Sequence, residues 1–201
     1  MIILVFDLDD TLLMSNEYNG YETIKYNREL YNLLNSLNYK KIIYTNGTYG
    51  HAEKSIPKLL GRNIFNETYA RDTIPYMKPL YQSFNHVKNS IFYNVNAHRY
   101  SDISFIFFDD NLDNMRMAKN IGWTSVWIPH RNYKDNIKNM NHPFVDYKYN
   151  NIFDALKDIY TIINDLNKQP FIASNSFQGK RNGYHFKKGN NGLGYYLDNN
   201  K

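Results

Sequence analysis

Four short apolar runs, separated by segments with helical spacing, constrain the fold of this chain more than any other feature. The runs cover residues 2–6, 41–45, 103–108 and 124–128. Apolar runs of this length, bounded by turn signals, are typical of strands buried on both faces of a sheet. Helices are expected at 21–37, 49–60 (with Pro57 disturbing the last turn), 79–95, 112–121 and 152–166. Strands alternating with helices predict an α/β fold with a doubly wound, Rossmann-like parallel sheet.

Polar residues follow three of these strands at the point where each ends. Asp7-Leu8-Asp9-Asp10-Thr11 comes after the first, Thr45-Asn46-Gly47 ends the second, and Asp109-Asp110 ends the third. A lysine, Lys78, precedes Pro79 at the start of an expected helix. Ligands of open α/β sheets bind at the carboxyl ends of the strands. These groups are therefore expected to meet in one site.

Hydrolysis of a phosphate monoester needs residues of these types. A nucleophile attacks phosphorus, cations neutralise the phosphate oxygens, and an acid protonates the leaving alkoxide. A carboxylate serves as the nucleophile when the reaction passes through an acyl phosphate. Magnesium binds one or two carboxylates, waters and the phosphate itself. Two aspartates at positions i and i+2 can divide the roles of nucleophile and general acid.

The sequence resembles the haloacid dehalogenase-like (HAD) superfamily in four motifs that occur in order. They are FDLDDTLL, YTNGT, MKP and FFDDNLDN, and the resemblance covers roughly residues 1–167. It implies an aspartyl-phosphate mechanism in which Asp7 is the nucleophile and Asp9 the general acid/base. It also implies that Thr45 and Asn46 bind phosphate and that Lys78 orients both the phosphate and Asp7.

The same resemblance implies Mg²⁺ as the cofactor. Asp7, the backbone carbonyl of Asp9, and Asp110 would bind the ion, and Asp109 would support them beside Lys78. The division of roles between Asp109 and Asp110 stays open at this point. Arg71 and Lys88 are alternatives to Lys78.

Within the superfamily, the segment FFDDNLDNMRMAKNIGWTSVWI is similar to the pyrimidine 5′-nucleotidase branch and to magnesium-dependent phosphatase-1. Nucleotidase relatives have a sizeable helical cap between the first two motifs. Here residues 12–44 leave room for one helix and its loops, and residues 48–77 leave little more. We therefore expect a HAD-like core with little or no cap and an open active site.

Residues 168–201 form a separate, basic extension rich in Gly, Asn and Tyr. They contain six of the 24 basic residues but one of the 19 acidic residues, so residues 1–167 are close to neutral. One interpretation is a mobile terminus. The other is an ordered flap that packs on the core or contacts a polyanion.

The chain has no cysteine, which excludes disulfides and thiolate metal sites. The apolar stretch before Asp7 is too short for a signal peptide or a membrane span, so a cytoplasmic or nuclear enzyme without membrane contact is expected.

We expect hydrolysis of phosphate monoesters, with nucleotides among the candidate substrates. Two alternatives remain open: a phosphatase of phosphoproteins or nucleic-acid ends, and a non-catalytic binding module on the same scaffold. Two assignments also stay undecided. His51 follows the second motif and is interpreted as a surface residue, and Asn114 suits a solvated helix as well as a site.

Overall fold

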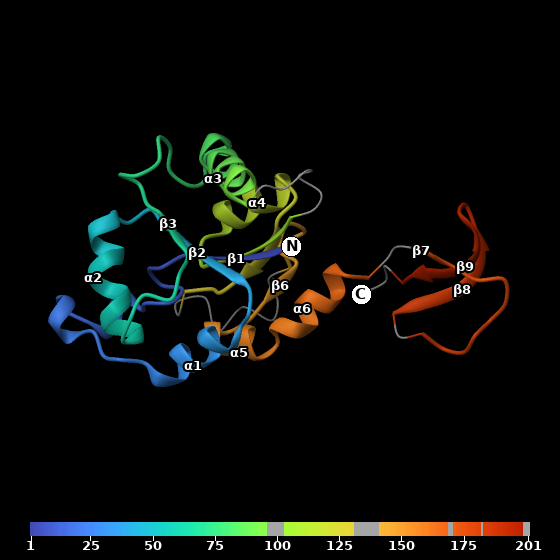
Figure 1. Cartoon of the computed structure of the whole chain (residues 1–201), viewed down its shortest axis with the longest axis horizontal. Helices are drawn as coiled ribbons and strands as arrows, with labels where there is room; N and C mark the ends of the chain where they lie inside the picture. Colours follow the sequence, from blue (N-terminus) through green and yellow to red (C-terminus); the bar gives the residue numbers. More distant parts are fainter. Residues whose placement is uncertain (96–102, 131–140, 169–170, 182, 199–201) are drawn as a thin grey trace. The chain divides into compact units, whose positions relative to one another are not determined.

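The computed structural model divides the chain into two compact units, Met1–Asp158 and Ile159–Lys201 (Figure 1). It describes residues 1–95, 103–130, 141–168, 171–181 and 183–198. The expected boundary between core and extension, at residue 167, lies nine residues beyond this division. Each unit is described by itself below. No helix in the described ranges is long and apolar enough to cross a membrane.

The first unit is built on one parallel sheet with the strand order β3-β2-β1-β4-β5-β6. Its strands are β1 (Ile2–Phe6), β2 (Lys40–Tyr44), β3 (Glu67–Tyr69), β4 (Ser104–Asp109), β5 (Thr124–Trp127) and β6 (Tyr147–Lys148). The central strand β1 pairs with β2 on one side and β4 on the other, both in parallel register. The predicted doubly wound sheet is confirmed. The short edge strands β3 and β6 were not expected, because two or three residues leave too little pattern in a sequence.

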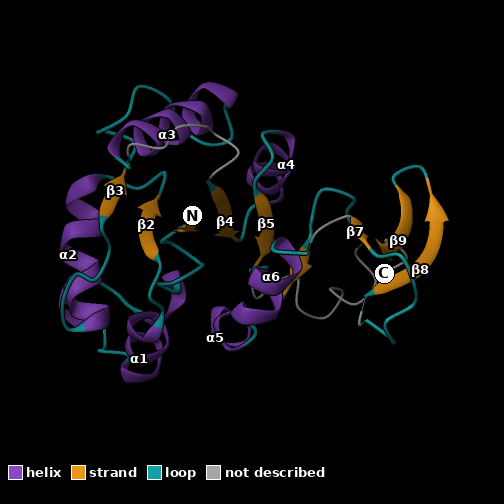
Figure 2. Cartoon of the chain, turned by 45° about the vertical axis from the view of Figure 1, so that its right-hand side comes forward, coloured by secondary structure: helices purple, strands orange, loops and turns teal. Residues whose placement is uncertain are grey.

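Helices cover both faces of this sheet (Figure 2). They are α1 (Arg28–Ser36), α2 (Tyr49–Leu60), α3 (Tyr81–Asn94), α4 (Leu112–Asn120) and α5 (Ile152–Lys157), and two 3₁₀ turns, η1 (Ser15–Glu17) and η2 (Tyr21–Thr23), precede α1. α3 and α4 lie on one face, whereas α1 and α5 lie on the opposite one. On the α3 and α4 face, side chains from alternate strand positions, such as Val5 and Phe107, pack with Phe84 and Trp123 in a fully buried core.

Two expected helices differ from the structure in their extent. The helix expected over 21–37 begins at Arg28, because the side chain of Asn27 caps it by accepting a hydrogen bond from the amide of Leu30 (3.0 Å). The helix expected over 152–166 is two helices, α5 and α6 (Ile159–Leu166), divided at Asp158. At this break between the two helices, the phenol of Tyr149 donates a hydrogen bond to the carboxylate of Asp158 (2.5 Å). Pro57 does not end α2, which continues to Leu60.

The second unit contains α6 and a three-stranded antiparallel sheet of order β7-β9-β8. The strands are β7 (Phe171–Ala173), β8 (Tyr184–Gly189) and β9 (Gly192–Leu197). Gly194 explains part of the glycine pattern, because a Cβ atom there would lie 2.3 Å from the carbonyl oxygen of Ile172. Only glycine lets β7 and β9 approach this closely. The described part of the extension therefore contains a three-stranded sheet.

Candidate active site

The carboxyl ends of β1, β2 and β4 bring the predicted residues to one edge of the sheet. The amide of Asp7 donates to the carbonyl of Phe108 (2.9 Å), and the amide of Thr45 donates to the carbonyl of Tyr69 (2.9 Å). The backbone at these positions therefore continues the strand ladder. Asp7 and Thr45 are held in place by the sheet before their side chains make any contact.

Lys78 is the centre of the site and is almost fully buried. Its ammonium group donates three hydrogen bonds to oxygen atoms at the strand ends: Asp7 Oδ1 (2.7 Å), Asp109 Oδ2 (2.7 Å) and the carbonyl of Tyr44 (2.8 Å). An ammonium group has three N–H donors, so all of them are used. The structure thus places Lys78 against Asp7, whereas the alternative Arg71 is exposed.

Asp109 is completely buried and its carboxylate is engaged on both oxygens. Besides Lys78, the side-chain amide of Asn114 donates to both oxygens (2.9 and 3.0 Å), and the amide of Asn111 donates to Oδ1 (2.8 Å). These bonds leave Asp109 little capacity to bind a metal ion, which supports its expected role behind Asp110. They also show that Asn114 is part of the site and not a solvated helix residue.

The carboxylates outnumber the cations in this cluster. Burial raises the pKa of Asp7, and the charges of Asp109 and Asp110 raise it further against the opposing effect of Lys78. Burial, together with the charges of Asp109 and Asp10, raises the pKa of Asp110 to about 6. Ionised Asp7 and Asp110 therefore need more positive charge than Lys78 supplies.

A hard divalent cation fits this requirement. Within the described residues, no three acidic, histidine or cysteine side chains converge as a complete metal-binding set. Magnesium does not need such a set, since it keeps several waters and is held by one or two carboxylates plus substrate phosphate. Asp7 and Asp110 would supply the two carboxylates, a pair of oxygen ligands of the kind that magnesium takes, and each raises the energetic cost of ionising the other in the absence of a cation.

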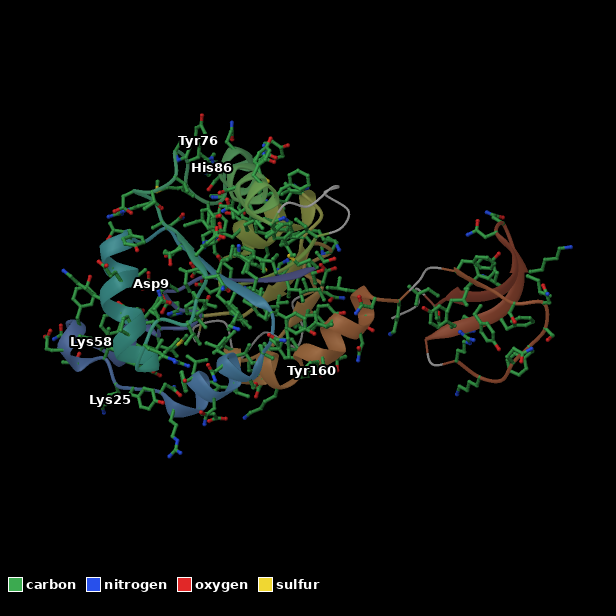
Figure 3. The ribbon with its side chains drawn as sticks, viewed as in Figure 1. Asp9, Lys25, Lys58, Tyr76, His86 and Tyr160 are labelled. Atoms are coloured by element: carbon green, nitrogen blue, oxygen red, sulfur yellow. The ribbon has the colours of Figure 1, made fainter. Side chains whose placement is uncertain are left out.

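Asp9, labelled in Figure 3, contacts a residue of α2. Its Oδ1 lies 2.8 Å from Nε2 of His51, and Nδ1 of His51 lies 3.2 Å from the phenolic oxygen of Tyr21. The side chain of Asp9 is 37% exposed, compared with 9% for Asp7. Asp9 is thus accessible to a leaving group while His51 fixes its orientation. The interpretation of His51 as a surface residue was wrong.

The two polar side chains of the second motif, Thr45 and Asn46, make different contacts. Thr45 is buried, and its hydroxyl accepts a hydrogen bond from the amide of Gly47 (2.9 Å). The side chain of Asn46 instead pairs with the backbone of Lys78, donating to its carbonyl (2.9 Å) and accepting from its amide (3.0 Å). The side chain of Asn46 therefore positions the lysine segment, and the expected contact of Asn46 with phosphate stays a prediction.

Gly47 allows the second motif to approach Asp9 closely. A Cβ atom at this position would lie 3.2 Å from Oδ2 of Asp9 and 3.2 Å from Oγ1 of Thr45. Any larger residue would push these two side chains apart. From the sequence, Gly47 indicated only a turn.

A turn after Asp9 separates the two neighbouring aspartates. Asp10 has a positive φ of 58°, and its carboxylate accepts hydrogen bonds from the amide and hydroxyl of Ser15 (3.0 and 2.6 Å).

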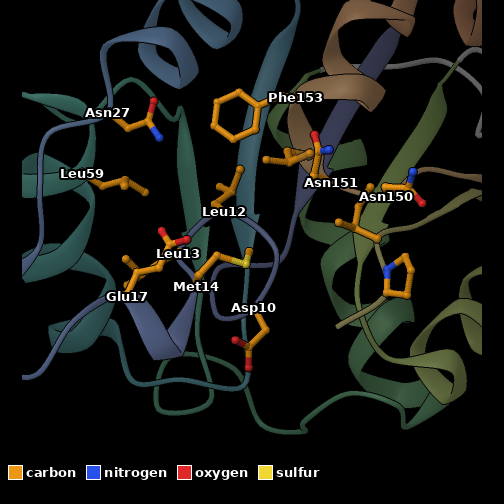
Figure 4. Close-up of a pocket in the computed structure, with 13 residues that line it drawn as sticks. Asp10, Leu12, Leu13, Met14, Glu17, Asn27, Leu59, Asn150, Asn151 and Phe153 are labelled. Carbon is orange, nitrogen blue, oxygen red and sulfur yellow. The ribbon is translucent and has the colours of Figure 1, made fainter. Parts of the chain in front are cut away.

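A cavity of about 100 Å³ lies on the Asp10 side of this loop (Figure 4), lined by apolar residues that include Leu12, Leu13 and Met14. Neither Asp7 nor Asp9 lines it, so this cavity is separate from the candidate site.

Little chain is available to cover the site. Between β1 and β2 the chain forms only a loop, η1, η2 and α1, without a further folded domain. The expected small cap agrees with these elements.

Comparisons with known proteins identify the fold. No protein-family model matches the chain, and no curated protein matches its sequence. The HAD-hydrolase YfnB from Bacillus subtilis, in a form bound to magnesium, aligns over 81% of this chain and 98% of its own, with 16% identity and a TM-score of 0.55.

Two further solved structures align with lower scores. A dehalogenase matches with a TM-score of 0.47 and CbbY from Rhodobacter sphaeroides, in complex with phosphate, with 0.46, each at 14% identity. They cover 67% and 62% of this chain, which spans 53% and 52% of theirs. This chain therefore corresponds to about half the length of those two proteins.

Proposed function

We propose that this chain, which has the fold of the HAD hydrolases, is a magnesium-dependent phosphomonoester hydrolase with Asp7 as nucleophile. One observation carries the proposal. Lys78 joins the carboxylates of Asp7 and Asp109 at 2.7 Å each, while Asp9 is held beside them by His51. The cluster thus provides a nucleophile, a fixed cation and a separately oriented acid.

The first chemical step transfers the phosphoryl group to Asp7. Lys78 donates to Oδ1 of Asp7 at 2.7 Å, whereas Oδ2 accepts a longer hydrogen bond from Thr11 (3.5 Å), so we assign Oδ2 as the oxygen that forms the new bond to phosphorus. The bond from phosphorus to the substrate oxygen breaks, and Asp9 gives its proton to that leaving oxygen. A magnesium ion held by Asp7 and Asp110 would supply positive charge to the phosphoryl oxygens and keep both carboxylates ionised.

The second step returns the enzyme to its starting state. Asp9, now a carboxylate, removes a proton from water as the water oxygen attacks phosphorus. The bond from phosphorus to Asp7 breaks, which releases inorganic phosphate and regenerates the Asp7 carboxylate. The hydrogen bond from His51 keeps Asp9 in place for both proton transfers.

Asp9 distinguishes this reaction from dehalogenation on the same fold. A halide is a weak base and leaves without a proton, whereas an alkoxide requires one. An oriented acid next to the nucleophile therefore supports a phosphatase. The short segment between β1 and β2 favours substrates whose phosphate is accessible, both nucleotides and the phosphorylated ends or side chains of macromolecules.

The test compares two substitutions within the same loop. Asp7→Asn should abolish release of phosphate from a small aryl phosphate in the presence of magnesium. Asp10→Asn is the matched control, because the carboxylate of Asp10 binds Ser15 and acts on Asp110 only through its charge, so the variant should retain activity within about tenfold. Aryl phosphatase activity of Asp7→Asn equal to wild type, or halide release from a haloacid with no phosphatase activity, would refute the proposal.

A further inference from the structure

The second unit has a sheet face covered by its own loop. On this face Phe186 of β8 lies opposite Tyr195 of β9. The phenol of Tyr195 ties the loop down, since it donates to the carbonyl of Gly179 (2.8 Å) and accepts from the amide of Gln178 (2.7 Å). The ring of Phe177, in the same loop, lies 5.7 Å from that of Phe186. The loop and the sheet thus form one ordered structure.

A hollow of about 590 Å³ remains between loop and sheet. This volume is within the range of small-molecule and nucleotide sites. Its lining combines aromatic rings and cationic side chains: Phe177, Lys180, Arg181, Tyr184, Phe186 and Tyr195. Phe177 is 61% exposed, so a large aromatic surface faces solvent at the edge of the hollow. An exposed ring beside cations is the combination that stacking of a base and contact with phosphate require.

The charge of this unit is strongly positive. It contains six basic residues and two acidic ones, Asp165 and Asp198. Asp198, which lines the hollow, forms an ion pair with His185 (2.7 Å). Arg181 lies 4.6 Å from the ring of Tyr195, an arrangement that fixes the guanidinium over the hollow.

We propose that this hollow binds single-stranded nucleic acid, with a base stacked on Phe177 and backbone phosphates against Lys180 and Arg181. Single-strand binding combines a basic groove with exposed aromatic rings that accept any base. A phosphopeptide would use the cations but not the exposed ring, and a paired duplex cannot present a free base face. This binding is independent of the proposed hydrolysis in the first unit.

Fluorescence anisotropy of the full-length chain tests the proposal. The probe is a labelled oligonucleotide of about 12 nucleotides without terminal phosphates, which excludes binding through the hydrolytic site. We expect saturable binding that weakens about sevenfold between 50 and 200 mM salt, as contact with two phosphates implies. The corresponding duplex should bind at least about fivefold more weakly, because its bases are not free to stack.

Substitutions separate the stacking from the charge. Phe177→Leu keeps an apolar side chain but removes the ring, and should weaken binding about tenfold or more, whereas Phe177→Tyr should retain it. Lys180→Gln with Arg181→Gln should nearly remove the salt dependence. The matched control removes two exposed lysines of the first unit, Lys25→Gln with Lys58→Gln (labelled in Figure 3), and should change affinity less than twofold. Unchanged thermal unfolding of each variant verifies its fold.

Several results would overturn the proposal. They are absence of saturable binding at 100 mM salt, equal affinity for duplex, and equal affinity of Phe177→Leu and wild type. Loss of binding in Phe177→Tyr as in Phe177→Leu would exclude base stacking. Tighter binding of a phosphopeptide or an anionic vesicle, lost in the same Lys180 and Arg181 variant, would assign the hollow to that other partner.

Discussion

Replacing Asp110 with asparagine should stabilise the metal-free protein, by an amount that depends on pH. Asparagine mimics the neutral carboxyl group, and it removes a negative charge that the carboxylates of Asp7, Asp109 and Asp10 repel. The folded-state pKa of Asp110 is about 6, compared with an ordinary value of 3.8. Each pK unit corresponds to about 1.4 kcal/mol, so the ionised group lowers the free energy of unfolding by up to about 3 kcal/mol.

The direction of the pH effect follows from this raised pKa. A carboxyl whose folded pKa is raised favours the fold below its unfolded pKa, and that contribution is lost as the pH rises through the folded pKa. For Asp110 the loss extends from about pH 4 to about pH 6. The stability difference between Asp110→Asn and wild type should therefore increase by about 2 kcal/mol between pH 4.5 and pH 7. For a chain of this length that is roughly 4–8 °C in Tm.

Thermal unfolding in the presence of a chelator measures this difference. A second series with magnesium measures how much the cofactor stabilises the folded protein. Binding to the folded state at 100 times Kd adds about 2.7 kcal/mol. Wild type should gain more from magnesium at pH 7 than at pH 4.5, because protons compete for Asp7 and Asp110. The Asp110→Asn variant should gain much less.

The control is Asp113→Asn, which removes a carboxylate whose side chain is 68% exposed. Its gain in stability from magnesium should equal that of wild type. The reasoning is refuted if Asp110→Asn follows wild type at every pH without metal. An equal gain from magnesium in the Asp110→Asn variant and wild type would separately refute the assignment of Asp110 as a ligand.

Three further substitutions test other parts of the structure. Lys78→Met should lower the free energy of unfolding in urea by about 3–5 kcal/mol, because Asp7 and Asp109 lose their buried counter-charge. Mild acid should restore part of that loss, and a loss below about 1 kcal/mol would contradict the geometry. His51→Asn should lower kcat roughly 10-fold to 100-fold with little change in KM, since His51 orients Asp9; a pure KM effect in steady-state kinetics would instead indicate substrate contact. Gly194→Val should disrupt the pairing of β7 with β9, which amide exchange would detect, and leave aryl phosphate hydrolysis unchanged.

The sequence by itself determined the fold and the strand ends that form the candidate site, because both depend on local patterns. Continuous apolar runs such as Ile2–Phe6 specify buried strands, and a polar residue that ends such a run must lie at the carboxyl edge of a parallel sheet. Asp7 and Asp109 are therefore close to each other whatever the details of packing. The charge of the extension was equally visible, since it depends on composition alone.

Tertiary structure decided which side chains from distant parts of the sequence contact one another. His51 is 42 residues from Asp9, and no local periodicity indicates which ring reaches which carboxylate. Lys78, 71 residues from Asp7, was expected beside it through the resemblance of the MKP motif, but only the folded chain shows its third contact, with the carbonyl of Tyr44. The pairing of the Asn46 side chain with the backbone of Lys78 was not predicted for the same reason. The sheet of the extension depends on the close approach that Gly194 permits between β7 and β9. Glycines leave no apolar alternation in a sequence, so only the folded chain shows these strands.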